Sequence, residues 1–162
     1  MNESPEQFDR WCARVNLGVM ETLYVAAAQR ARLFQMKTGS AVEVVYPAQA
    51  PIGMMEASRE LLYMKLTLEG SEIYLYSARS PGKPPTLNLV SHSGQLLPTE
   101  SKRPSDFRAL AKQRVSSMRL CRVLPTRDGG YVLYEPGTSE QRTRLDDVVH
   151  RLFDELVRRS RP

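Results

Sequence analysis

The spacing of apolar residues near the start of the chain predicts one long helix between Ser4 and Gly39. Ser4 is a good N-cap, Pro5 suits the first helical position, and Gln7 completes a Ser-x-x-Gln capping box. Gly39 follows the last periodic residue and provides a C-terminal stop. Local sequence therefore specifies both ends of this helix.

Two apolar stripes run along the predicted helix and together span roughly 200° of its surface, against the roughly 100° typical of a surface helix. The first stripe consists of Phe8, Cys12, Val15, Val19, Leu23, Ala26 and Leu33. The second consists of Leu17, Met20, Tyr24, Ala27, Ala31 and Phe34. One stripe faces a core. The second is either covered by other parts of the same chain or is an interface with a partner or a second copy.

Alternation of apolar and polar residues in the middle of the chain predicts antiparallel strands. The clearest hairpin joins residues 63–69 to 72–76 through a Gly70-Ser71 loop. That loop places Leu66 opposite Leu75 and gathers tyrosines on the other, exposed face. The remaining strands are expected at 42–46, 86–90, 95–97, 118–124 and 131–135.

Two further helices complete the predicted layout. Ser105 caps a short helix, and a closing helix that opens at Thr143 carries one apolar stripe. The pattern predicts a two-layer α+β fold: long N-terminal and C-terminal helices packed on a mostly antiparallel sheet of five or six strands, in a single domain over residues 1–162. This gross order is similar to that of α+β secretion chaperones, which are typically acidic dimers, whereas the present chain is basic.

Composition is that of an ordinary soluble globular protein, with 41% apolar and 25% charged residues. The acidic start of the chain is unlike a signal peptide, and no apolar run approaches the ~20 residues of a membrane span. We therefore expect a cytoplasmic protein without a membrane partner. Cys12 and Cys121 belong to no metal or redox spacing, so we expect both to be buried small apolar residues.

Catalytic motifs are missing from the sequence. The two histidines, His92 and His150, have no orienting group at a suggestive spacing, and no phosphate-binding glycine pattern occurs. The pair Asp146-Asp147 is explained by its place at the start of the last helix. We therefore expect a protein that is not an enzyme and that binds no cofactor or metal.

Positive charge is concentrated late in the chain, where residues 102–127 hold eight Lys or Arg and one Asp. Such a cluster can neutralise phosphates or an acidic protein surface, and Tyr74 and Tyr76 could serve as stacking platforms for a nucleic acid. The alternative is a solvated face of arginines within an arginine-rich composition. The residues named for anion binding are Arg108, Lys112, Arg114, Arg119, Arg122 and Arg127.

The surplus apolar surface of the first helix favours a non-enzymatic protein-binding or assembly module over other classes. Its partner is another protein or a second copy of the chain, held by the first helix or by the exposed sheet face. The alternative is an anion-binding or nucleic-acid-binding module that uses residues 102–127, although nucleic acid is the less favoured partner because no recognition-module signature occurs.

Overall fold

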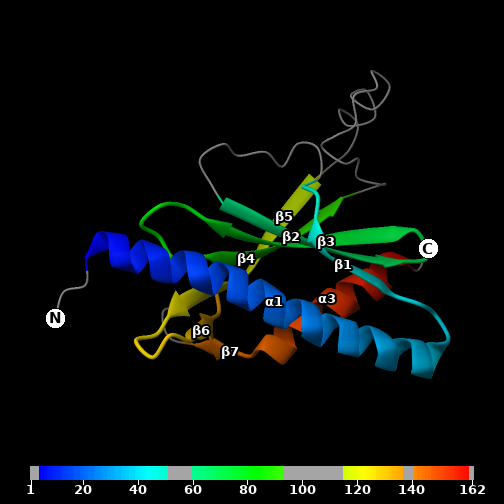
Figure 1. Cartoon of the computed structure of the whole chain (residues 1–162). Coiled ribbons are helices and arrows are strands. Elements are labelled where there is room, and N and C mark those ends of the chain that lie inside the picture. Colours follow the sequence, from blue (N-terminus) through cyan, green and yellow to red (C-terminus); the bar gives the residue numbers. More distant parts are fainter. Residues whose placement is uncertain (1–3, 51–59, 93–114, 137–140, 161–162) are drawn as a thin grey trace, which may run out of the picture.

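The computed structural model describes residues 4–50, 60–92, 115–136 and 141–160. These form an α+β fold in which a long N-terminal helix and a C-terminal helix pack on a seven-stranded antiparallel sheet (Figure 1). The strands follow one another in chain order from β1 to β7, so each strand pairs with its neighbours in sequence. The predicted fold class is confirmed, with seven strands in place of five or six.

Helix α1 spans Pro5–Thr38, in agreement with its predicted ends. The Ser4 hydroxyl accepts a hydrogen bond from the Gln7 amide at 3.2 Å, which satisfies one donor at the helix start. Gly39 has a φ of 77°, and its amide donates to the Gln35 carbonyl at 2.8 Å. Glycine adopts the left-handed conformation at little energetic cost, so the helix ends at this position.

The sheet and the second helix fill the rest of the described chain. Helix α3 follows the last strand and spans Leu145–Ser160, with Asp146 and Asp147 in its first turn. Residues 95–97 and the short helix expected after Ser105 lie outside the described residues. The strands are β1 (Glu43–Ala48), β2 (Glu60–Leu68), β3 (Ser71–Arg79), β4 (Thr86–His92), β5 (Val115–Pro125), β6 (Tyr131–Tyr134) and β7 (Arg142–Thr143).

The β2–β3 hairpin forms as predicted, but its turn lies one residue earlier in the chain. Glu69 and Gly70 are the turn residues, with φ of 51° and 83°, and Leu68 pairs with Ser71. Leu66 consequently faces Ile73, where the Gly70-Ser71 loop would place Leu75. Every pairing moves by two residues, so each side chain keeps its predicted face of the sheet.

The main core lies between the sheet and the two helices, and both helices contribute to it. From α1 it takes fully buried residues such as Val19 and Leu23, and from α3 it takes Leu152 and Leu156. The sheet supplies inward-facing residues of the central strands, which alternate with residues on the far face. These are Met64, Leu66, Leu68, Ile73, Leu75, Leu87, Leu89 and Val123.

The far face of the sheet holds a second, smaller buried cluster of Tyr63, Tyr74 and Val90. Tyr63 stacks on Tyr76 with ring centroids 5.5 Å apart, and Tyr74 is only 4% exposed. Burial raises the pKa of Tyr74 to about 12. The expectation that Tyr74 is an exposed stacking platform is therefore wrong, because its ring is part of this cluster.

Candidate functional site

The second apolar stripe of α1 lies against the core. Met20, Ala27 and Ala31 are buried, while Tyr24 and Phe34 are partly buried and pack on the same cluster. Leu17 differs, since it is 49% exposed. The residues predicted as a partner interface were Leu17, Met20, Tyr24, Ala27, Ala31 and Phe34. Five of these six are covered by other parts of the same chain, and Leu17 is not.

Open apolar surface is found on the outer side of α1. Val25 is 55% exposed, Leu33 is 51% exposed and Met36 is 82% exposed. At ~100° per residue these three side chains project within about 80° of one another, on the side away from the buried Ala27. Leu33 belongs to the stripe predicted to face the core. The prediction is wrong for Leu33, because the buried side of the helix takes residues from both stripes and leaves Leu33 at its edge.

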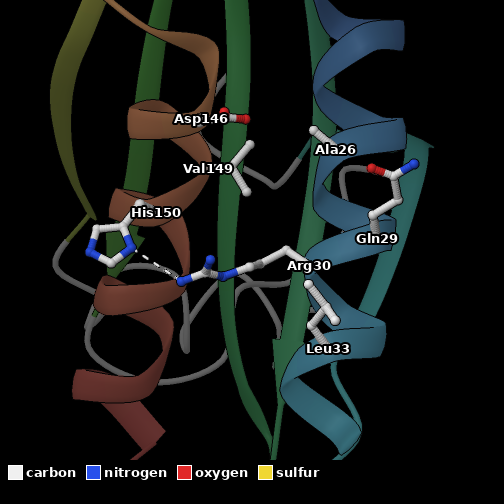
Figure 2. Close-up of a pocket in the computed structure, with 7 residues that line it drawn as sticks. All are labelled: Ala26, Gln29, Arg30, Leu33, Asp146, Val149 and His150. Carbon is white, nitrogen blue, oxygen red and sulfur yellow. Dashed lines mark hydrogen bonds between the residues drawn. The ribbon is translucent and has the colours of Figure 1, made fainter. Parts of the chain in front are cut away.

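Beside this outer side, a groove runs between α1 and α3 (Figure 2). Its volume is about 310 Å³. Its apolar lining comes from Ala26, Leu33 and Val149, and polar side chains of both helices surround that surface. We call this the α1–α3 groove, and its lining residues are Ala26, Gln29, Arg30, Leu33, Asp146, Val149 and His150.

Arg30 reaches across the groove from α1 to α3, as Figure 2 shows. Its Nη2 lies 3.2 Å from Nδ1 of His150, and Nε2 of His150 lies 3.1 Å from a carboxylate oxygen of Asp154. The guanidinium can only donate, so Nδ1 is the acceptor in this contact, and the Nε2 edge of the ring faces Asp154. The contact with the ring gives Arg30 a hydrogen bond but no carboxylate partner.

Asp146 lines the same groove from the first turn of α3. Within the described part of the chain, neither Asp146 nor Arg30 forms an ion pair with a group of opposite charge. The positive end of α3 stabilises the carboxylate locally, but the side chain remains exposed. The α1–α3 groove thus combines an apolar lining with one exposed positive side chain, Arg30, and one exposed negative side chain, Asp146.

A different polar arrangement holds the first half of α1 to the sheet. Arg79 on β3 donates to Asp9 at 2.6 Å and to Glu60 at 2.7 Å. Asn16 donates to the same Glu60 carboxylate at 3.3 Å and accepts a hydrogen bond from the Ser77 hydroxyl. We call these five residues the α1 anchor.

The charges of the α1 anchor stabilise one another. The hydrogen bond from the Gly82 amide lowers the pKa of Asp9, and Arg79 lowers it further. The hydrogen bond to Glu60 raises the pKa of Arg79. Asn16 and Ser77 are fully buried, so their mutual hydrogen bond removes the cost of burying unpaired polar groups. The arrangement fixes the position of α1 on β2 and β3.

The predicted anion-binding residues are brought together only in part. Arg119 and Arg122 pair with Asn88 and Thr86 of β4, which places both on the far face of the sheet. Arg122 lies 6.0 Å from the ring centre of Tyr134, and Arg119 is exposed. Arg127 is exposed in the turn between β5 and β6. Three members of the set, Arg108, Lys112 and Arg114, lie outside the described residues.

Both cysteines are buried, as predicted. Burial raises the pKa of the Cys12 thiol and raises that of the Cys121 thiol to about 12, so neither is primed as a nucleophile. Across the described ranges, no group of three or more His, Cys, Asp or Glu side chains could hold a metal ion. His92 ends strand β4, where a turn was expected.

Comparison with protein-family models, with curated proteins and with solved structures finds no match to this chain. Among the described residues, the helices lack the combination of length and apolar character that crossing a membrane requires.

Sequence reasoning missed the α1–α3 groove as a site. Two signals were present: Val25 and Met36 fall outside both apolar stripes, and the charged residue Arg30 interrupts the first apolar stripe between Ala26 and Leu33. Apolar residues outside the core stripes are the local sign of a second contact surface. Their neighbours on α3, Asp146 and His150, could be identified only once the packing of the two helices was known.

Proposed function

We propose that this chain is a non-enzymatic protein-binding module and that the α1–α3 groove, together with the outer side of α1, is its binding surface. The observation that carries the proposal is the exposure of Val25, Leu33 and Met36 along one side of α1, next to an open groove. Large apolar side chains gathered on one side of an element, next to a concave site, mark contact surfaces more often than scattered ones do.

The chemistry of the groove suits a protein partner. Leu33 offers apolar contact, while Gln29, Arg30 and Asp146 can hydrogen-bond a partner at its edges. A volume of about 310 Å³ accommodates a few side chains of an approaching helix or strand. The chain therefore holds its partner by side-chain insertion flanked by polar contacts.

Photo-crosslinking in the natural host tests this function. A photo-reactive amino acid at Gln29, which lines the groove, is compared with the same amino acid at Lys83, which is exposed in the β3–β4 connection. We expect protein adducts from position 29 and none above background from position 83. Equal labelling from the two positions, or none from position 29, would contradict a protein-binding role for the groove.

The anion-binding alternative has weaker support in the described residues. Arg119 and Arg122 share the far face of the sheet, but Tyr74 on the same face is buried rather than offered to bases. If the alternative holds, binding to DNA or RNA should weaken steeply as salt rises, because phosphate contacts release counterions. Affinity that is insensitive to salt would exclude it.

A further inference from the structure

We infer that the occupant of the α1–α3 groove is a second copy of this chain, docked across a two-fold axis. The inference rests on the proposed function and names the partner of that same surface. Its basis is the presence, in one groove, of Arg30 and Asp146 beside the apolar side chain of Leu33. Such a surface can be complementary to itself.

Two-fold symmetry sets a condition that this groove meets. In an isologous interface, every residue of the patch on one copy contacts the patch of the other copy, and each contact occurs twice. Where charged groups pair across the axis, the patch must therefore carry both signs of charge. Arg30 comes from α1 and Asp146 from α3, so a two-fold axis through the groove can set the arginine of each copy against the aspartate of the other.

The contacts inside the chain leave both charges ready for this pairing. Arg30 donates to the His150 ring, and no carboxylate in the described part of the chain forms an ion pair with it. Asp146 likewise forms no ion pair among the described residues. Pairing each charge across the interface provides the missing partner without breaking an ion pair that stabilises the monomer.

The composition of the groove also separates this occupant from others. A groove for an acidic or a basic peptide would be lined by charges of one sign. A surface with apolar residues and one charge of each sign matches a copy of itself. The open side chains of Val25 and Met36 extend the apolar area along α1, a helix about 50 Å long at 1.5 Å per residue.

Charge reversal on two separate chains tests the inference. Arg30→Glu alone would place glutamate against Asp146 of the other copy, and Asp146→Arg alone would place two arginines together. Each homodimer should then be weaker by about 100-fold, because like charges meet at two equivalent contacts. In an equimolar mixture of the two variants, both contacts pair opposite charges, so a heterodimer should form with affinity close to that of the wild type.

Sedimentation velocity at micromolar concentration measures all four samples. We expect a dimer for the wild type, monomers for each variant and a dimer for the mixture. Lys83→Glu and Glu43→Arg, which change charge by the same amount at exposed positions outside the groove, should leave the wild-type dimer unchanged. Recovery in the mixture would also show that both variants fold.

Three results would overturn the inference: a monomeric wild type, dimers of the single variants with unchanged affinity, or a mixture that stays monomeric. Failure of the proposed function gives a different result. A monomeric chain whose position 29 crosslinks to another protein would retain the binding role and exclude a second copy as the occupant. A chain without adducts from position 29 would contradict both.

Discussion

Both halves of α1 pack on the core, but only the first half is also held by buried and partly buried polar contacts. The first half is fixed by the α1 anchor, in which Asp9 and Asn16 bond to side chains of β2 and β3. The second half packs on the core through Ala27 and Ala31 and exposes Leu33 on its outer side. The comparison shows that one helix can combine a specific attachment with apolar surface that folding does not use.

The largest expected difference is in the unfolding free energy lost when a leucine on the buried side of α1 and one on its outer side are each replaced by alanine. Leu23 is fully buried and Leu33 is 51% exposed, although both belong to the stripe predicted to face the core. Leu23→Ala should destabilise the monomer by about 2–5 kcal/mol, because it leaves a cavity in the core. Leu33→Ala should cost about 0.5 kcal/mol or less.

Urea unfolding at protein concentrations low enough to keep the chain monomeric compares the two leucine variants. Equal losses of unfolding free energy would mean that the outer side of α1 belongs to the fold, and the distinction between its two sides would fail.

Two serines provide a smaller difference, because one belongs to the buried attachment of the first half of α1 and the other forms an exposed contact just after the end of the helix. The Ser77 hydroxyl is buried and donates to Asn16, whereas the Ser40 hydroxyl is exposed and donates to Glu69 at 3.3 Å. Ser77→Ala should cost about 1–3 kcal/mol, because it leaves the buried Asn16 oxygen without that donor. Ser40→Ala should cost roughly 0.5 kcal/mol or less, since water can replace the lost partner.

Urea midpoints of the two serine variants, measured side by side, check this expectation. A Ser77→Ala chain as stable as Ser40→Ala would show that the α1 anchor adds little to the attachment of the helix.

The smallest expected effect is the pH dependence of the stability that the α1 anchor contributes. The pKa of Asp9 is lowered in the folded chain, first by the Gly82 amide and then by Arg79. The stabilisation from Asp9 is therefore complete above its unfolded pKa of about 3.9 and is lost as pH falls through the lower folded value. The Asp9→Asn variant has no carboxyl group at this position and does not lose this stabilisation on acidification. The stability advantage of the wild type over Asp9→Asn should therefore shrink below about pH 4.

The comparison of these two chains removes contributions that both share, such as that of Glu155, whose pKa is also lowered. Unfolding midpoints across the acidic range measure the difference. An advantage of the wild type that stays constant on acidification would contradict the role given to Asp9.

Features set by neighbouring residues could be predicted from the sequence. Both ends of α1 follow from Ser4 and Gly39, because caps depend on a few adjacent groups. The β2–β3 hairpin was placed correctly, but its turn was not, since Glu69 adopts a positive φ that glycine or asparagine normally supplies. The faces of both strands survived this error because the pairings moved by an even number of residues.

Features that depend on packing could not be predicted. Strand β7 has two residues, and its pairing with β6 is determined by the fold rather than by a local pattern. The width of the α1 stripes showed surplus apolar surface, but which part is covered depends on the positions of α3 and the sheet. The groove joins Arg30 to residues more than a hundred positions later, a proximity that no local spacing encodes.

The most direct measurement is the sedimentation of the equimolar mixture of Arg30→Glu and Asp146→Arg chains, beside each chain alone and the wild type. It addresses the claim that the open side of α1 and the groove beside it receive a second copy. We expect dimers in the mixture and in the wild type, and monomers in each variant alone. A mixture that sediments as monomers beside a dimeric wild type would contradict the claim.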